Sequence, residues 1–246
     1  MQRLGYTRSS RQQDHLLLTP DTFIRAPLPG MQRATAVVHV SPAMGAGFTQ
    51  YTAEFEAGGL LAPAEAQRFV YVIEGELAVK DGSGERRLVA GDYCYVAASY
   101  AAHFEAAAAG RAAVIEKVYQ PLENWAAHGA APLSGRESDV EPKPLMGDDA
   151  LAVRVLLPDD FAFDFAVNTM TFQPGAALPM VEIHVMEHGL LMLEGGGIYR
   201  LGESWYPVTA GDFIWMAPYC PQWFGALGKT PAKYLIYKDW NRHPLA

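Results

Sequence analysis

Four residues in the second half of the chain have the types and spacing of a metal site. Glu182 and His184 are two residues apart, His188 follows four residues later, and Gln222 lies eleven residues beyond Gly211. In a strand, side chains at even spacing point to the same face, so the first three would converge if this segment is extended. Oxygen and imidazole donors without a thiolate suit Mn²⁺, Fe²⁺ or Zn²⁺. Two neutral imidazoles, a carboxylate and an amide would leave such an ion positively charged, able to bind an anionic or chelating substrate or a water molecule.

Each of these residues also has an ordinary structural interpretation. A single histidine in an apolar segment is more often a hydrogen-bonded core residue than a ligand, but four candidates at the offsets of one frame favour metal binding. Gln222 is the weakest ligand type and has an alternative role as a hydrogen-bond partner of a ligand. Glu187 has the opposite parity from His188, so we expect it to be solvated.

The first half of the chain repeats the frame of the second half without its ligands. Gly75 and Gly195 are 120 residues apart, as are Gly91 and Gly211, and each pair stands in a similar local sequence. A repeat of this length indicates two copies of one structural unit. The residues of the first copy that match the four candidate ligands cannot replace them, and we expect that copy to bind no metal; they are Ala62, Ala64, Arg68 and Ala102.

The apolar pattern within each copy is that of short strands. Segments such as Phe69–Ile73 and Tyr234–Tyr237 are rich in aromatic and β-branched residues and are bounded by glycine, proline or charged residues. Such strands at regular spacing predict an all-β protein of two tandem jelly-roll barrels. We place the first barrel at residues 1–127, a linker without apolar periodicity at 128–147, and the metal-binding barrel at 148–246.

Composition narrows the classes of partner. The 246 residues carry a net charge of −8, which argues against nucleic acid because phosphate binding favours a basic surface. We see no signal peptide and no apolar stretch long enough to span a membrane, so we expect a cytoplasmic protein acting on a small molecule. Cys94 and Cys220 are too few for a disulfide framework and are predicted to be core residues.

The ligand positions resemble those of the cupin superfamily, which usually places His, His, Glu and His there. The set Glu182, His184, His188 and Gln222 more specifically resembles the (S)-ureidoglycine aminohydrolase family, bicupin enzymes of purine breakdown. The opening His15–Asp21, the turn Gly195–Tyr199 and the tail Tyr234–Arg242 are similar to the same family. The resemblance implies a Mn²⁺ enzyme of allantoin degradation that releases ammonia from (S)-ureidoglycine to give (S)-ureidoglycolate.

The resemblance also implies that Tyr199, Tyr234 and Lys238 contact the substrate. Lys238 is four residues after Tyr234, so both side chains share a strand face. The ammonium could pair with the substrate carboxylate or move a proton, and the phenols could hold the urea group. From the residues alone, barrel packing explains the tyrosines equally well, and a solvated strand end explains the lysine.

Two other functions share this frame. A dioxygenase or isomerase would use a related metal site, but Gln222 argues against the three-histidine or two-histidine-one-carboxylate iron sites of dioxygenases. A non-enzymatic bicupin that binds small molecules would have no need for four convergent ligands, and metal analysis separates it from the enzymes. We also expect a homo-oligomer, in which Trp223, Phe224 and Trp240 are candidates for an interface on the outer strands.

Overall fold

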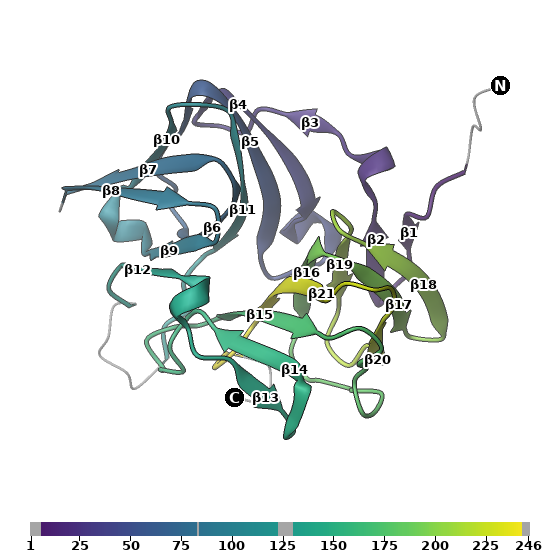
Figure 1. The fold of residues 1–246 in the computed structure, drawn as a ribbon. Coiled ribbons are helices and arrows are strands. Elements are labelled where there is room, and N and C mark those ends of the chain that lie inside the picture. Colours follow the sequence, from purple (N-terminus) through teal and green to yellow (C-terminus); the bar gives the residue numbers. More distant parts are fainter. Residues whose placement is uncertain (1–5, 83, 123–129, 243–246) are drawn as a thin grey trace.

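The chain folds almost entirely into β-strands, as Figure 1 shows for the computed structural model. The structure describes residues 6–82, 84–122 and 130–242. Within these residues the helical elements are single 3-10 turns: η1 (Pro20–Thr22), η2 (Pro42–Met44), η3 (Ala98–Tyr100) and η4 (Glu137–Asp139). The predicted all-β class is confirmed.

The N-terminal barrel is one sheet whose strands pair antiparallel throughout. Its strands are β3 (Arg25–Ala26), β4 (Met31–Val40), β5 (Thr49–Leu61), β6 (Gln67–Glu74), β7 (Glu76–Asp81), β8 (Gly84–Val89), β9 (Asp92–Val96), β10 (His103–Ala106), β11 (Gly110–Lys117) and β12 (Leu133–Arg136).

The C-terminal barrel consists of a large sheet and a three-stranded sheet. The large sheet contains β1 (Ser10–Arg11), β2 (His15–Leu18), β13 (Lys143–Leu145), β14 (Asp148–Val155), β15 (Ala166–Phe172), β16 (His188–Glu194), β19 (Phe213–Met216) and β21 (Ala232–Lys238). The small sheet contains β17 (Gly196–Leu201), β18 (Ser204–Thr209) and β20 (Gln222–Ala226).

The two barrels exchange strands across the boundaries expected from sequence. β2, near the start of the chain, pairs with β19 of the C-terminal barrel, and β12, from the expected linker 128–147, pairs with β9 of the N-terminal barrel. The expected linker also contains β13, so much of it is ordered structure rather than a plain connector. The proposed boundary between residues 127 and 128 lies outside the described residues.

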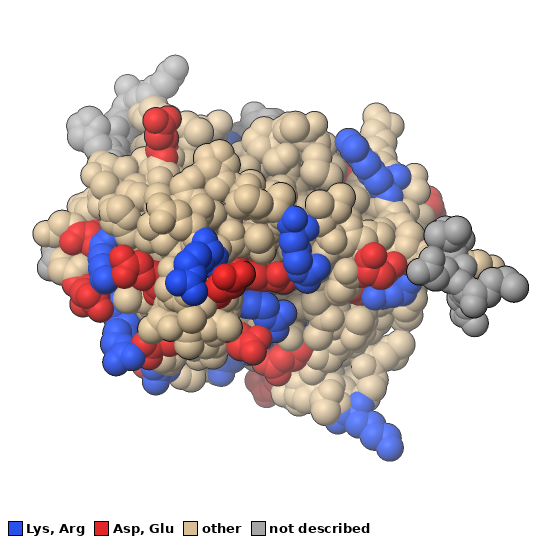
Figure 2. Space-filling model, turned by 90° about the horizontal axis from the view of Figure 1, so that it is seen from above, with Lys and Arg blue, Asp and Glu red and all other residues tan. Residues whose placement is uncertain are grey.

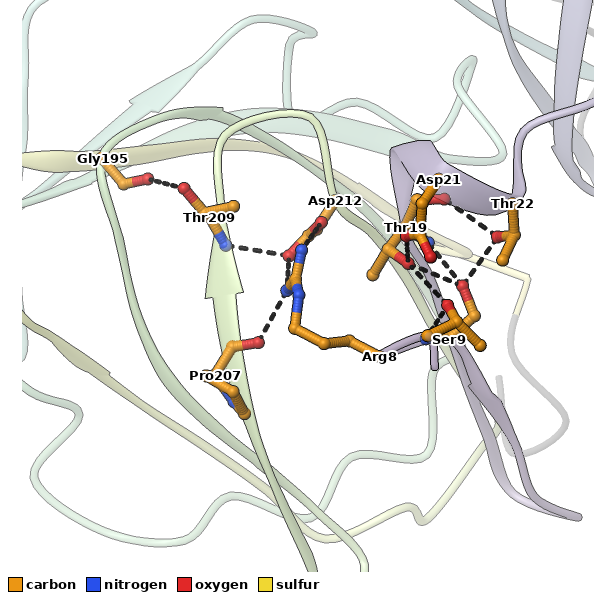
Figure 3. A network of polar contacts seen from close by, with 10 residues as sticks. Arg8, Ser9, Thr19, Asp21, Thr22, Gly195, Pro207, Thr209 and Asp212 are labelled. Atoms are coloured by element: carbon orange, nitrogen blue, oxygen red, sulfur yellow. Dashed lines mark hydrogen bonds and ion pairs between the residues drawn. The ribbon is translucent and has the colours of Figure 1, made fainter. Parts of the chain in front are cut away.

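In each exchanged segment an arginine forms an ion pair with an aspartate of the barrel that the segment joins. Figure 3 shows Arg8 donating to both carboxylate oxygens of Asp212, at 2.5 and 2.8 Å, and to the Pro207 carbonyl at 2.9 Å. Arg136 does the same at the other end, donating to Asp92 at 2.7 and 3.3 Å. Each aspartate also accepts from a turn amide three residues earlier, so the Gly-Asp turn of each repeat anchors the incoming segment.

Three apolar cores follow from strand alternation. One fills the N-terminal barrel and includes Val70 and Cys94, and a second fills the C-terminal barrel and includes Leu190 and Tyr234. The third lies between the barrels and takes alternate residues of the same strands, such as Leu191. The central strands are therefore buried on both faces, which accounts for their nearly continuous apolar sequences.

The exposed surface carries both signs of charge. On the face shown in Figure 2, lysine and arginine side chains are interspersed with aspartate and glutamate, without a continuous basic patch among the described residues. Within the described residues, no helix has the length and apolar character needed to cross a membrane.

Candidate metal centre

A backbone bridge and the start of a strand position the four candidate ligands. Glu182 and Gln222 form an isolated antiparallel bridge, in which the Glu182 amide donates to the Gln222 carbonyl at 2.8 Å and the Gln222 amide to the Glu182 carbonyl at 2.9 Å. His188 is the first residue of β16. The segment between Glu182 and His188 is irregular, so the expected continuous strand is wrong there. The bridge, rather than regular alternation, places Glu182 beside Gln222.

All seven predicted site residues line a single cavity of about 210 Å³ in the C-terminal barrel. They are Glu182, His184, His188, Tyr199, Gln222, Tyr234 and Lys238. The rest of the wall is apolar: Leu145, Met146, Val153, Met170, Leu178 and Ile236. The polar groups thus gather in one part of an otherwise apolar pocket, an arrangement typical of small-molecule sites.

Short contacts already connect several of these polar groups. Glu182 Oε2 lies 3.2 Å from His184 Nε2, and the rings of His184 and His188 meet edge to face with centroids 5.3 Å apart. The Tyr199 hydroxyl donates to Gln222 Oε1 at 3.1 Å. Tyr199 therefore orients the amide oxygen that a metal ion would use.

The electrostatics of His188 suit a metal ligand. Burial, together with the nearby Lys238 and His184, holds the pKa of His188 well below its usual value, so the ring is neutral. Its Nδ1 atom is buried and has no hydrogen-bond partner. A neutral imidazole that lines the same cavity as a carboxylate and an amide oxygen completes a donor set that fits a divalent cation.

The three residues predicted to contact the substrate surround this donor set. Lys238 is the cross-strand partner of His188, and burial lowers the pKa of its ammonium while the Glu182 carboxylate opposes that effect. Burial raises the pKa of Tyr199 and of Tyr234 above the usual phenol value, which keeps both hydroxyls protonated as donors. Sequence reasoning missed Asn168 on β15. With its amide nitrogen donating to the Val167 carbonyl (3.0 Å), its oxygen accepts from Lys238 Nζ at 3.3 Å.

The matching position in the N-terminal barrel is closed. A cavity of only about 10 Å³ remains there, lined in part by Ala64, Arg68 and Ala102. The Arg68 guanidinium fills the space: it pairs with Glu116 at 2.6 Å, donates to the Ala62 carbonyl at 2.8 Å and lies over the Phe104 ring. This barrel offers neither the space nor the donors for a metal ion at the equivalent position.

Comparison with known proteins supports the same assignment for both halves. Residues 43–119 match the EutQ-like cupin domain model, and residues 168–237 match the cupin domain model. The chain is 39% identical to the (S)-ureidoglycine aminohydrolase of Arabidopsis thaliana, over 98% of this chain and 80% of that protein. It is 32% identical to the Escherichia coli (strain K12) enzyme of that name, over 92% and 88% of the two chains. The crystal structure of protein Ylba from E. coli superposes with a TM-score of 0.84 at 28% identity, covering 96% of this chain and 95% of that one.

The chain belongs to the (S)-ureidoglycine aminohydrolase family. The bicupin architecture and the family resemblance predicted from sequence are therefore confirmed.

The environment of Glu187 differs from the one expected from sequence. Parity correctly places it off the cavity face, but the expectation that it is solvated is wrong, because its side chain is buried against the N-terminal barrel. One carboxylate oxygen accepts from the Gly47 amide at 2.8 Å and the other from the Trp215 indole at 3.1 Å.

A second group of potential ligands lies outside the cavity. The donor atoms of Asp14, His15 and Cys220 all lie within 4.8 Å of one another, so this group is a possible metal site. Both ring nitrogens of His15 already have partners, Asp14 at 2.8 Å and Tyr206 at 2.9 Å. Sequence spacing could not reveal the group, because strand exchange brings His15 to Cys220 from the far end of the chain.

Of the three residues suggested for an oligomer interface, one lies in the core. Phe224 is fully buried in the C-terminal core, so its proposed place on the outside of the barrel is wrong. Trp223 and Trp240 are half-buried, and their indoles donate to the Leu178 carbonyl and to Asp159, each at 2.7 Å. Both cysteines are buried core residues, as predicted.

Proposed function

We propose that this family member is a metal-dependent enzyme that hydrolyses (S)-ureidoglycine to (S)-ureidoglycolate and ammonia. The observation that carries the proposal is the cavity in which Glu182, His188 and Gln222 face Lys238. Ureidoglycine carries a carboxylate, an amine and a urea group on one carbon, and this cavity offers a donor set for a cation, an ammonium and two phenols.

The proposed metal ligands are Glu182, His184, His188 and Gln222, and the proposed ion is Mn²⁺, with Fe²⁺ and Zn²⁺ as alternatives. A bound divalent ion would supply Lewis-acid polarisation of the substrate groups that it contacts.

Lys238 and the tyrosines orient the substrate and move protons. The Lys238 ammonium pairs with the substrate carboxylate, and the Tyr234 hydroxyl donates to the urea oxygen. The Tyr199 hydroxyl, which donates to Gln222, accepts from a urea N–H. The net reaction replaces the amine nitrogen by the oxygen of water, so the leaving nitrogen must gain a proton and the water must lose one. Because burial lowers its pKa, Lys238 is the side chain suited to exchange that proton at Nζ.

The deciding experiment measures ammonia release from freshly generated ureidoglycine, with metal content determined on the same sample. Ammonia release that depends on the metal supports the proposal. Metal-loaded protein that leaves ureidoglycine intact would contradict it, and oxygen consumption by an iron-loaded sample would favour a dioxygenase instead.

We also propose that the chain assembles as a homo-oligomer. Met180, Ile183 and Tyr219, all on or near the segment that carries the candidate ligands, are more than half exposed at 56%, 61% and 54%. Light scattering that gives the mass of a single chain would contradict this part of the proposal.

A further inference from the structure

The strands that carry His188 and Lys238 have a second face, which packs against the N-terminal barrel. On β16 the cavity face begins with His188, and the opposite face carries Gly189 and Leu191. On β21 the residue behind Lys238 is Tyr237, the cross-strand partner of Gly189. The rear of the site is therefore formed by residues that alternate with the site residues themselves.

Residues 47–50 of the N-terminal barrel cover this rear face. The Gly47 amide donates to Glu187 at 2.8 Å, and the Phe48 ring stacks on Tyr237 with centroids 3.8 Å apart. Glu187 is in turn tied to Trp215, whose backbone pairs with Gly189. One short segment thus contacts the residue before His188 and the residue before Lys238.

The fit at this contact requires two glycines. A Cβ atom on Gly47 would lie 2.6 Å from Glu187 Oε1. A Cβ atom on Gly189 would lie 2.5 Å from both Phe48 Cζ and Gln50 Oε1. A methyl group at Gly47 would displace the Glu187 carboxylate, and one at Gly189 would displace the Phe48 ring or the strand, so the contact leaves no free space at either glycine.

We propose that the segment 47–50 of the metal-free barrel is a positioning element for the metal site. Through Glu187, Gly189 and Tyr237 it holds the backbone that presents His188 and Lys238 to the cavity. Groups behind a metal ligand that fix its orientation contribute to metal affinity without touching the ion. The inference extends the proposed function, because it assigns the N-terminal barrel a part in the chemistry of the other barrel.

Two substitutions test this through Mn²⁺ affinity, measured by calorimetric titration and by electron paramagnetic resonance of the unbound ion. In Glu187→Gln the amide can accept from only one of its two N–H partners and turns a donor toward the other. In Gly189→Ala the new methyl group points away from the cavity and displaces Phe48 or β16. We expect each variant to raise the dissociation constant for Mn²⁺ about 10–100-fold.

Tyr95→Phe is the matched control. Tyr95 is also buried between the barrels, and its hydroxyl donates to Gln67 at 2.7 Å. The variant loses this hydrogen bond, which does not involve the segment 47–50. We expect its Mn²⁺ affinity to equal that of the native chain even if its melting temperature falls. Native affinity in both Glu187→Gln and Gly189→Ala would overturn the proposal, as would an equal loss in Tyr95→Phe. Because the readout needs no substrate, a chain that binds Mn²⁺ but lacks activity would refute the proposed function and leave this test intact.

Discussion

Replacing Lys238 with methionine isolates the contribution of its charge. Methionine preserves an unbranched apolar stem in a half-buried strand position, so the C-terminal core should remain packed. The ammonium makes one hydrogen bond in the structure, to the Asn168 oxygen at 3.3 Å, and otherwise faces the cavity. The substitution therefore removes a cation that the fold itself scarcely uses.

The expected loss follows from the proposed pairing with the substrate carboxylate. A hydrogen bond to a charged group contributes about 1.5–3 kcal/mol, which corresponds to a fall in kcat/KM of roughly 10- to 150-fold. Metal affinity should be retained, because Lys238 is one of the groups that disfavours positive charge at His188. A loss beyond about 1,000-fold would show that Lys238 also transfers a proton.

Lys233→Met provides the control on the same strand. Lys233 pairs with Glu137 at 3.3 Å and Glu194 at 2.7 Å, outside the metal cavity, so we expect its removal to leave kcat/KM near the native value. The assay is ammonia release from ureidoglycine with manganese content measured in parallel. Native kcat/KM in Lys238→Met, or an equal loss in Lys233→Met, would refute the assigned role.

Two further results are expected. Elemental analysis should give one metal ion per chain. The ion should be lost in His184→Ala and kept in Cys220→Ser, while the circular dichroism spectrum stays unchanged in both variants. Loss of the ion in Cys220→Ser but not in His184→Ala would place it at the Asp14 group. Burial lowers the pKa of His39 to about 3. Below about pH 6.5 the unfolded chain therefore binds a proton at His39 that the folded chain does not bind, and the free energy of unfolding decreases as the pH is lowered. The free energy of unfolding should be about 2–3 kcal/mol lower at pH 4.5 than at pH 7. Urea titrations should show a smaller decrease in His39→Gln, and an unchanged decrease in the control His103→Gln, whose side chain is exposed.

Much of the site could be predicted because its four ligand positions resemble the spacing of the cupin metal site. The turns at Gly75 and Gly195 fix the register of the two copies, and that register identifies the residues of the first copy that match the ligands. The structure gathers all seven predicted residues around one cavity, although their roles remain predictions. Asn168 escaped notice because it lies on a different strand, β15, with no ligand or motif at a fixed distance in sequence.

The misplacement of Glu187 has one physical cause, whereas Phe224 shares the parity of Gln222 and faces the C-terminal core. Alternation tells which residues share a face but not what covers that face, and here the second face of β16 meets another barrel rather than water. The run Leu190–Leu193 carried that information, since apolar residues of both parities indicate a strand buried on both sides. Strand exchange is harder to foresee, because β2 and β12 pair with strands about 200 and 40 residues away, respectively, at distances that no local pattern encodes.

The N-terminal barrel retains the frame of the site with its charges rearranged. Arg68 pairs with Glu116 across β6 and β11 in the register in which His188 pairs with Lys238 across β16 and β21. A cation at the ligand position and a carboxylate at the lysine position neutralise each other, so the buried pair closes the barrel without an ion. Since its cavity is closed while its outer face contacts the strands of the candidate site, we expect metal binding to depend more on the exterior of this barrel than on its interior. Substitutions at Gly47 should therefore impair metal binding more than substitutions at Ala64, which can be measured side by side in the two variants.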